Sequence, residues 1–107
     1  MQQIGAHELQ QWIQNASRVS PFLLDVREPW EYEYCHIANS RLVPMQSVPG
    51  KLDTLDKNAH IVVICHHGVR SMQVARYLEH AGFEQVYNLQ GGVDSWARVV
   101  DTGMRTY

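Results

Sequence analysis

Residues 61–71 of the chain, IVVICHHGVRS, place a reactive side chain between two elements of regular structure. The run from Ile61 to Ile64 consists of β-branched residues, which is typical of a strand with both faces buried in a parallel sheet. Apolar residues then recur at helical spacing, at Val69, Met72, Ala75, Leu78 and Ala81. Gly82 follows where a left-handed helix end is expected. The segment therefore predicts a buried strand, a short loop and a helix.

The same alternation of strand and helix extends over the rest of the chain. Strand-like runs occur at Phe22–Val26, Arg41–Pro44, Ile61–Ile64 and Gln85–Leu89. Helical patterns occur at about Ala6–Ala16, with Leu9, Trp12, Ile13 and Ala16 on one face, and after Gly91-Gly92, through Val93, Trp96, Val99 and Val100; Pro29–Cys35 and Ser47–Leu55 predict short helices. Strands that alternate with helices predict an α/β domain, with a central, mainly parallel sheet and helices on both faces.

Length and composition favour one domain over residues 1–107, since 107 residues with 45% hydrophobic content suffice for one modest core. The net charge of -2 gives no electrostatic reason to expect nucleic acid or an anionic membrane as a partner. The sequence has no apolar run of about 18 residues and no signal-peptide pattern at its start. The two cysteines suit a reducing compartment, and we expect a cytoplasmic protein.

The Cys65 loop, residues 65–71, is the candidate active site. At the carboxyl ends of parallel strands, the N-terminus of the following helix points toward a bound ligand, and its N–H groups form an anion-binding concavity. A cysteine there is stabilised as the thiolate by those donors and by Arg70. Gly68 lets the backbone adopt a conformation closed to other residues. We therefore predict that Cys65 is a nucleophile; the alternative is a buried structural cysteine.

The chain resembles the single-domain rhodaneses, a family of thiosulfate and thiol sulfurtransferases. The resemblance rests on three segments that follow the family's order between about Ile4 and Trp96. The first is LDVREPWEY at residues 24–32, followed by His36-Ile37 and Val43-Pro44; the second is the Cys65 loop; the third is NLQGG at residues 88–92, followed by Trp96.

The resemblance implies a rhodanese-like fold and a double-displacement reaction. Cys65 would take a sulfur atom from a small donor such as thiosulfate, become a persulfide, and pass the sulfur to a small thiol, cyanide or a protein thiol, with ping-pong kinetics. The loop residues His66, His67, Gly68, Val69, Arg70 and Ser71 would surround the substrate, and their N–H groups would stabilise developing charge. No metal or organic cofactor is expected, and the protein would be a monomer or a weak dimer.

The resemblance also implies that Asp25, Arg27 and Glu31 form a charged network behind the Cys65 loop. The alternative is that Asp25 or Glu28 simply begins a helix. For His66 we favour an exposed ring whose backbone N–H matters more than its side chain, whereas His67 stays open between that role and anion binding.

Two other functions are alternatives to sulfur transfer. Phosphatases of similar architecture have five residues between the cysteine and the arginine, whereas four separate Cys65 from Arg70. The shorter loop favours a sulfur atom over a phosphoryl group. A binding or regulatory module is the second alternative, but it has no chemical need for cysteine, glycine and arginine in this loop.

Two departures and one further motif concern the backbone. Cys35 stands where the family usually has glycine. If the family's glycine has a positive φ, the cysteine would be strained there, because cysteine tolerates a positive φ poorly. A role for Cys35 as resolving partner of Cys65 also stays open. The Asn39-Ser40 pair replaces a small Gly-Ala pair and predicts a turn variation. We expect Gly91-Gly92 to allow close packing before the last helix. The geometry disfavours a zinc site built from Cys65, His66 and His67, because adjacent residues in a tight loop cannot readily supply closed tetrahedral ligation.

Overall fold

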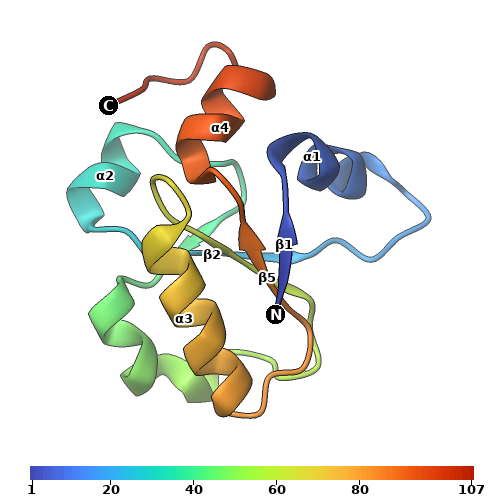
Figure 1. The fold of residues 1–107 in the computed structure, drawn as a ribbon, viewed down its shortest axis with the longest axis vertical. Helices are drawn as coiled ribbons and strands as arrows, with labels where there is room; N and C mark the ends of the chain where they lie inside the picture. Colours follow the sequence, from blue (N-terminus) through green and yellow to red (C-terminus); the bar gives the residue numbers. More distant parts are fainter.

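The computed structural model describes every residue from Met1 to Tyr107. Five strands form one sheet in the order β1-β5-β4-β2-β3, and every neighbouring pair is parallel (Figure 1). The strands are β1 (Gln2–Ile4), β2 (Phe22–Asp25), β3 (Arg41–Leu42), β4 (Ile61–Ile64) and β5 (Val86–Leu89). The predicted α/β class and the parallel sheet are confirmed.

Helices cover both faces of this sheet. They are α1 (Ala6–Gln14), α2 (Pro29–Tyr34), α3 (Val69–His80), α4 (Gly92–Val99) and the 3-10 helix η1 (Met45–Thr54). In Figure 1, α3 and η1 lie together in the lower half of the view, and α1 and α4 lie in the upper half. None of the helices has both the length and the apolar composition that crossing a bilayer requires.

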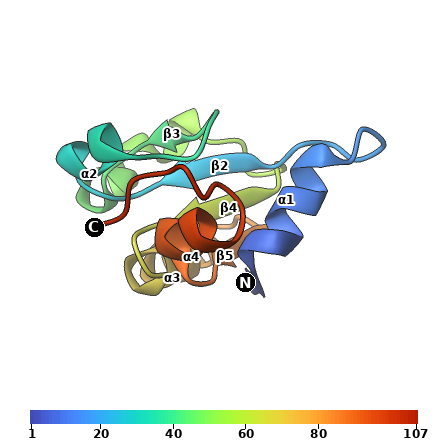
Figure 2. The same cartoon turned by 90° about the horizontal axis from the view of Figure 1, so that it is seen from above.

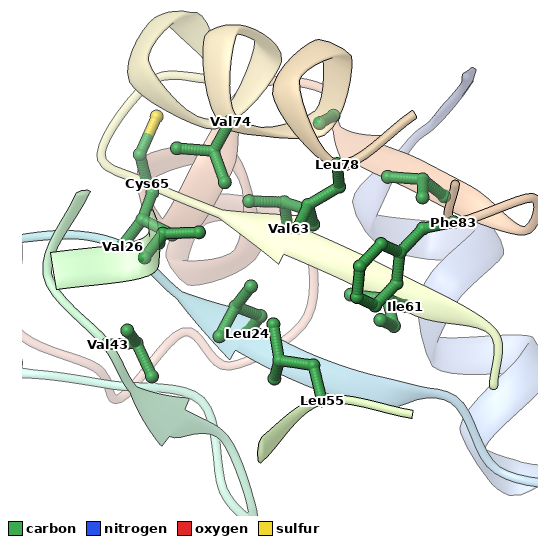
Figure 3. Packing of buried hydrophobic residues seen from close by; sticks show 13 residues of the cluster. Leu24, Val26, Val43, Leu55, Ile61, Val63, Cys65, Val74, Leu78 and Phe83 are labelled. Atoms are coloured by element: carbon green, nitrogen blue, oxygen red, sulfur yellow. The ribbon is translucent and has the colours of Figure 1, made fainter. Parts of the chain in front are cut away.

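The core consists of two apolar clusters, one on each face of the sheet. Alternate residues of the strands point to opposite faces, so that Val63 belongs to the cluster under α3 and η1, and Val62 to the cluster under α1 and α4. All four residues of β4 are buried, as predicted. Figure 3 shows Cys65 at the edge of the first cluster, with its sulfur directed toward the start of α3. Cys65 therefore lies at the carboxyl edge of the sheet, directly after the central strand β4.

Several details of the elements differ from the sequence prediction. The sequence did not predict β1, because only Ile4 of its three residues is buried. Helix α1 ends at Gln14, so Ala16 lies outside it. Ile13, which we expected on the buried face, is 38% exposed. The side chain of Val69 is 67% exposed, because the buried face of α3 is formed instead by Ser71, Val74, Ala75 and Leu78. Val99 at the end of α4 is also exposed.

Candidate active site

Cys65 follows the central strand β4, which pairs with β2 on one side and β5 on the other. Gly68 is the residue before α3 and has a φ of +100°, the left-handed backbone that we expected. Its N–H group donates a hydrogen bond to the sulfur of Cys65 at 3.0 Å. A Cβ atom at residue 68 would also lie 3.2 Å from the nitrogen of Gly91, a tight contact, so the positive φ favours glycine and the crowded space adds to that preference.

The sulfur of Cys65 also contacts a chain of neutral polar side chains. It lies 3.2 Å from the hydroxyl of Ser71, and that hydroxyl donates to the side-chain oxygen of Asn88. The amide nitrogen of Asn88 in turn donates to the carbonyl of Gly68 at 3.1 Å and to the side chain of Gln3 at 2.8 Å. Because the Ser71 proton points to Asn88, the Ser71 oxygen accepts the proton of Cys65 when the cysteine is a thiol.

The sequence prediction used Asn88 only as part of a motif and missed this contact with the site. The available signal was one polar side chain inside an otherwise apolar strand, VYNL, where it is 1% exposed. A buried amide needs hydrogen-bond partners, and here the Cys65 loop supplies them.

The first turn of α4 closes against the backbone of the Cys65 loop. The N–H of Val93 donates to the carbonyl of Cys65 at 2.9 Å, and the N–H of Asp94 donates to the carbonyl of His66 at 3.1 Å. Gly92 has a φ of +58°, and a Cβ atom there would lie 2.3 Å from the Cys65 carbonyl oxygen. The prediction that this glycine pair serves close packing is confirmed.

Arg70 forms an ion pair with Glu31 of α2, and its charge also interacts favourably with Cys65, as we had expected. Its two terminal nitrogens donate to the two carboxylate oxygens of Glu31 at 2.7 and 2.9 Å. The N–H of Glu28 donates to the same carboxylate at 2.9 Å. Burial alone would raise the pKa of Glu31, but these hydrogen bonds, together with one from Tyr107, lower that pKa to about 2. The hydrogen bond to Glu31 also raises the pKa of Arg70, so both groups are charged.

Asp25 and Arg27 form a second ion pair, and both side chains are 0% exposed. The guanidinium of Arg27 donates to Asp25 at 2.7 and 2.9 Å, to the carbonyl of Cys35 at 2.7 Å and to the carbonyl of Glu31 at 3.3 Å. Asp25 therefore lies in a charged network, as the resemblance implied, and does not begin a helix. Glu28 is the residue that precedes α2.

The substitution of Cys35 for the family's usual glycine does not strain the backbone. Cys35 has a φ of −162°, which is extended backbone that any residue adopts. Asn39, by contrast, has a φ of +68°, a conformation that asparagine tolerates better than most residues, and this fits the predicted turn variation. Cys35 and Cys65 are both buried free thiols.

The ring of His66 is packed rather than exposed, so our interpretation of this side chain was wrong. It stacks on the ring of Tyr107 with centroids 3.8 Å apart and planes 8° apart, and its other neighbour is His67, also at 3.8 Å. The Nε2 atom of His66 is buried without a hydrogen-bond partner. Burial, with the neighbouring charge of His67, lowers the pKa of His66, which favours a neutral imidazole at physiological pH.

His67 points outward, and its Nδ1 lies 4.0 Å from the carboxylate of Asp94. Ligand atoms of His66, His67 and Asp94 lie within 4.8 Å of one another. However, both oxygens of Asp94 accept hydrogen bonds from Arg98, at 3.0 and 3.3 Å. This carboxylate is therefore already neutralised by a guanidinium, which disfavours a cation at the same place.

A hollow of about 400 Å³ lies beside Arg70, between the start of α2 and the start of η1. It combines polar and apolar walls, and is lined by Val26, Glu28, Pro29, Pro44, Met45, Gln46, Ser47 and Arg70. A space of this size admits a small-molecule ligand next to the last residues of the Cys65 loop.

Comparisons with known proteins agree with this geometry. Residues 5–99 match the rhodanese-like domain family. The chain is 35% identical over 98 residues to the thiosulfate sulfurtransferase GlpE of Pseudomonas paraeruginosa, covering 92% of this chain and 86% of that protein. It is 33% identical over 96 residues to the GlpE of Actinobacillus pleuropneumoniae, covering 90% and 86%. A crystal structure of a rhodanese-like domain protein from Staphylococcus aureus superposes with a TM-score of 0.85 at 31% identity, covering 100% of this chain and 99% of that one.

Proposed function

The chain belongs to the rhodanese-like domain family, and we propose that this sulfurtransferase carries the transferred sulfur as a persulfide on Cys65. Thiosulfate is the donor that we propose, because the similar proteins are named for it. The acceptor would be a thiol or another thiophile. We also propose that residues 1–107 act as one domain, since a single sheet with two flanking clusters accounts for the whole core.

The proposed reaction consists of two displacements at sulfur. The thiolate of Cys65 attacks the outer sulfur of thiosulfate; a new S–S bond forms, the old S–S bond breaks, and sulfite leaves with the electron pair. The acceptor thiolate then attacks the outer sulfur of the persulfide, and Cys65 leaves as the thiolate. Each step moves one sulfur atom and needs no external oxidant or reductant.

The hydrogen bond from the N–H of Gly68 to the sulfur of Cys65, at 3.0 Å, carries the proposal. This donor lies at the N-terminus of α3, a 12-residue helix whose first N–H groups have no partner within the helix. Such donors stabilise a thiolate before attack and the negative charge of the persulfide after it. The arrangement is in place before substrate binds, so little reorganisation is needed in the reaction.

The test is the intact mass of the protein after incubation with thiosulfate and removal of the excess. We expect the wild-type protein and Cys35→Ala to gain the mass of one sulfur atom, because the thiolate of Cys65 is present in both. Cys65→Ser should gain none, and a dithiol should remove the added mass from the wild type. Absence of the adduct from the wild type, or its retention in Cys65→Ser, would refute the proposal. Turnover of an aryl phosphate that depends on Cys65 would favour the phosphatase instead.

A further inference from the structure

The segment after α4, residues 101–107, lies outside the residues that match the family and crosses from α4 to α2 (Figures 1 and 2). Its course brings Tyr107 beside two aromatic residues of α2. The centroid of the Tyr107 ring lies 5.6 Å from that of Trp30 and 5.8 Å from that of Tyr34. Nothing in the proposed reaction uses this segment. The contacts of Tyr107 nevertheless reach both ends of the Cys65 loop.

The ring of Tyr107 contacts the first end of the loop. It stacks nearly parallel on the imidazole of His66, at a centroid distance of 3.8 Å. Because His66 is the residue next to Cys65, its orientation affects the backbone that surrounds the sulfur. A stacked aromatic pair of this kind restricts the orientation of both rings.

The hydroxyl of Tyr107 is linked to Arg70, near the other end of the loop, because both groups donate hydrogen bonds to Glu31. It donates to the Oε2 atom of Glu31 at 2.7 Å, and it accepts a hydrogen bond from Arg27 at 2.9 Å. The direction of both bonds is fixed, because a guanidinium can only donate and a carboxylate can only accept. Burial and the contact with Glu31 raise the pKa of Tyr107 to about 12, so the hydroxyl keeps its proton at physiological pH.

Together these contacts form one chain of alternating charges that ends in the loop. Asp25 pairs with Arg27, Arg27 donates to Tyr107, Tyr107 donates to Glu31, and Glu31 pairs with Arg70. The hydroxyl of Tyr107 is the neutral link between the two ion pairs. Without it, the carboxylate of Glu31 retains only Arg70 and the N–H of Glu28 as partners.

We propose that Tyr107 is a positioning residue for sulfur transfer: its ring fixes His66, and its hydroxyl orients the Glu31 carboxylate that holds Arg70. This inference rests on the proposed function of Cys65. The charged groups at the loop are Glu31 from α2, Asp94 from α4, and His67 and Arg70 within the loop, with the titratable ring of His66. Arg27, which follows β2, is linked to them through the hydroxyl of Tyr107. Because Tyr107 contacts Glu31, Arg27 and His66, its loss changes the surroundings of the thiolate as well as the packing.

The experiment compares Tyr107→Phe, which keeps the ring, with Tyr107→Leu, which removes both the ring and the hydroxyl. Tyr34→Phe is the matched control, because that hydroxyl bonds only the carbonyl of Thr106, at 3.4 Å. All variants are made in a Cys35→Ala background, so that a single thiol reacts. Two quantities are measured: the pH dependence of Cys65 alkylation by iodoacetamide, and the kinetics of sulfur loading from thiosulfate.

We expect Tyr107→Phe to raise the pH midpoint of alkylation by about 0.5 unit, because the loop's donors are less well ordered around the thiolate. Sulfur loading should slow about threefold in Tyr107→Phe and about tenfold in Tyr107→Leu, mainly in the rate constant at saturating thiosulfate rather than in the thiosulfate concentration that gives half the maximal rate. Tyr34→Phe should match its background in both measurements. A lower thermal stability of Tyr107→Phe with an unchanged midpoint and loading rate would overturn the inference, since it would reduce Tyr107 to a packing residue.

The two measurements separate this inference from the proposed function. If the wild-type protein gains no sulfur but the alkylation midpoint shifts in Tyr107→Phe, the proposed function fails and the role in sulfur transfer fails with it, although Tyr107 then still affects the Cys65 thiolate. If the wild-type protein gains sulfur and Tyr107→Phe equals it in midpoint and rate, the proposed function is supported and the positioning role fails.

Discussion

The Cys65 loop is held on two sides by contacts of opposite character. On the neutral side, Ser71, Asn88 and Gly92 hold the loop through uncharged hydrogen bonds and direct backbone contact. On the charged side, Arg70 is held by the chain of ion pairs through Glu31, Tyr107, Arg27 and Asp25. The neutral side depends on backbone shape and the charged side on the orientation of long side chains.

This difference determines how each side responds to change. A backbone contact at van der Waals distance tolerates no added atom, and its strength does not depend on protonation. A network of buried charges tolerates small movements, but it fails when one partner loses its charge. The neutral side should therefore set the shape of the loop, and the charged side should make the loop sensitive to pH and to single charge removals.

The largest effect is expected for Gly92→Ala on the neutral side. The added methyl would lie 2.3 Å from the carbonyl oxygen of Cys65 and 2.4 Å from that of His66, at a φ of +58°. We expect a loss of more than about 4 kcal/mol in the free energy of unfolding, measured by urea denaturation, or failure to fold. Gly50→Ala is the matched control, because a Cβ there has no atom within 4 Å, and it should stay within about 1 kcal/mol of the wild type. Equal stability of the two variants would contradict the close contact.

The next largest effect is expected for Arg27→Met on the charged side. Methionine retains much of the side-chain length but leaves the carboxylate of Asp25 buried and unpaired, which costs about 3–5 kcal/mol. Arg98→Met is the control, since Arg98 forms an exposed ion pair with Asp94 of the same helix and should change stability by less than about 0.5 kcal/mol. The free energy of unfolding of both variants is measured by urea denaturation. A similar loss of stability in the two would contradict the expectation that the buried ion pair contributes more than the exposed one.

The neutral side was largely predictable from the sequence, because its features are local. The buried strand Ile61–Ile64, the left-handed Gly68 and the close packing at Gly91-Gly92 follow from residue type and position alone. Asn88 is the exception, since a motif named it but only the fold shows which groups its amide contacts.

The charged side was predictable only in outline. The resemblance supplied Asp25, Arg27 and Glu31, but it did not show that Glu31 binds Arg70, which lies 39 residues away in sequence. Tyr107 was missed entirely, because its contact with Arg27 spans 80 residues and no local pattern marks it. The packed ring of His66 was missed for the same reason, since Tyr107 is what covers it.

The smallest of the three effects is expected for Glu31→Gln. This variant distinguishes the charged side from the neutral side, because only the stability from the charged side depends on pH. The folded state holds the pKa of Glu31 at about 2, below its ordinary value of 4.5, so the carboxylate stabilises the fold fully above about pH 4.5. As the pH falls toward 2, the unfolded state takes up this proton more readily than the folded state, and the stabilisation is lost. At neutral pH the contribution is at most about 3 kcal/mol.

Urea denaturation at a series of pH values tests this expectation. Glu31→Gln should be about 2–3 kcal/mol less stable than the wild type at pH 7, and the difference should shrink steadily between about pH 4.5 and pH 2. Glu33→Gln, an exposed position on the same helix, should show no such difference. Every other acidic group titrates equally in both proteins, so its contribution cancels in the difference between their free energies of unfolding. If this difference stays constant over the pH range, the charged side stabilises the loop by packing, as the neutral side does.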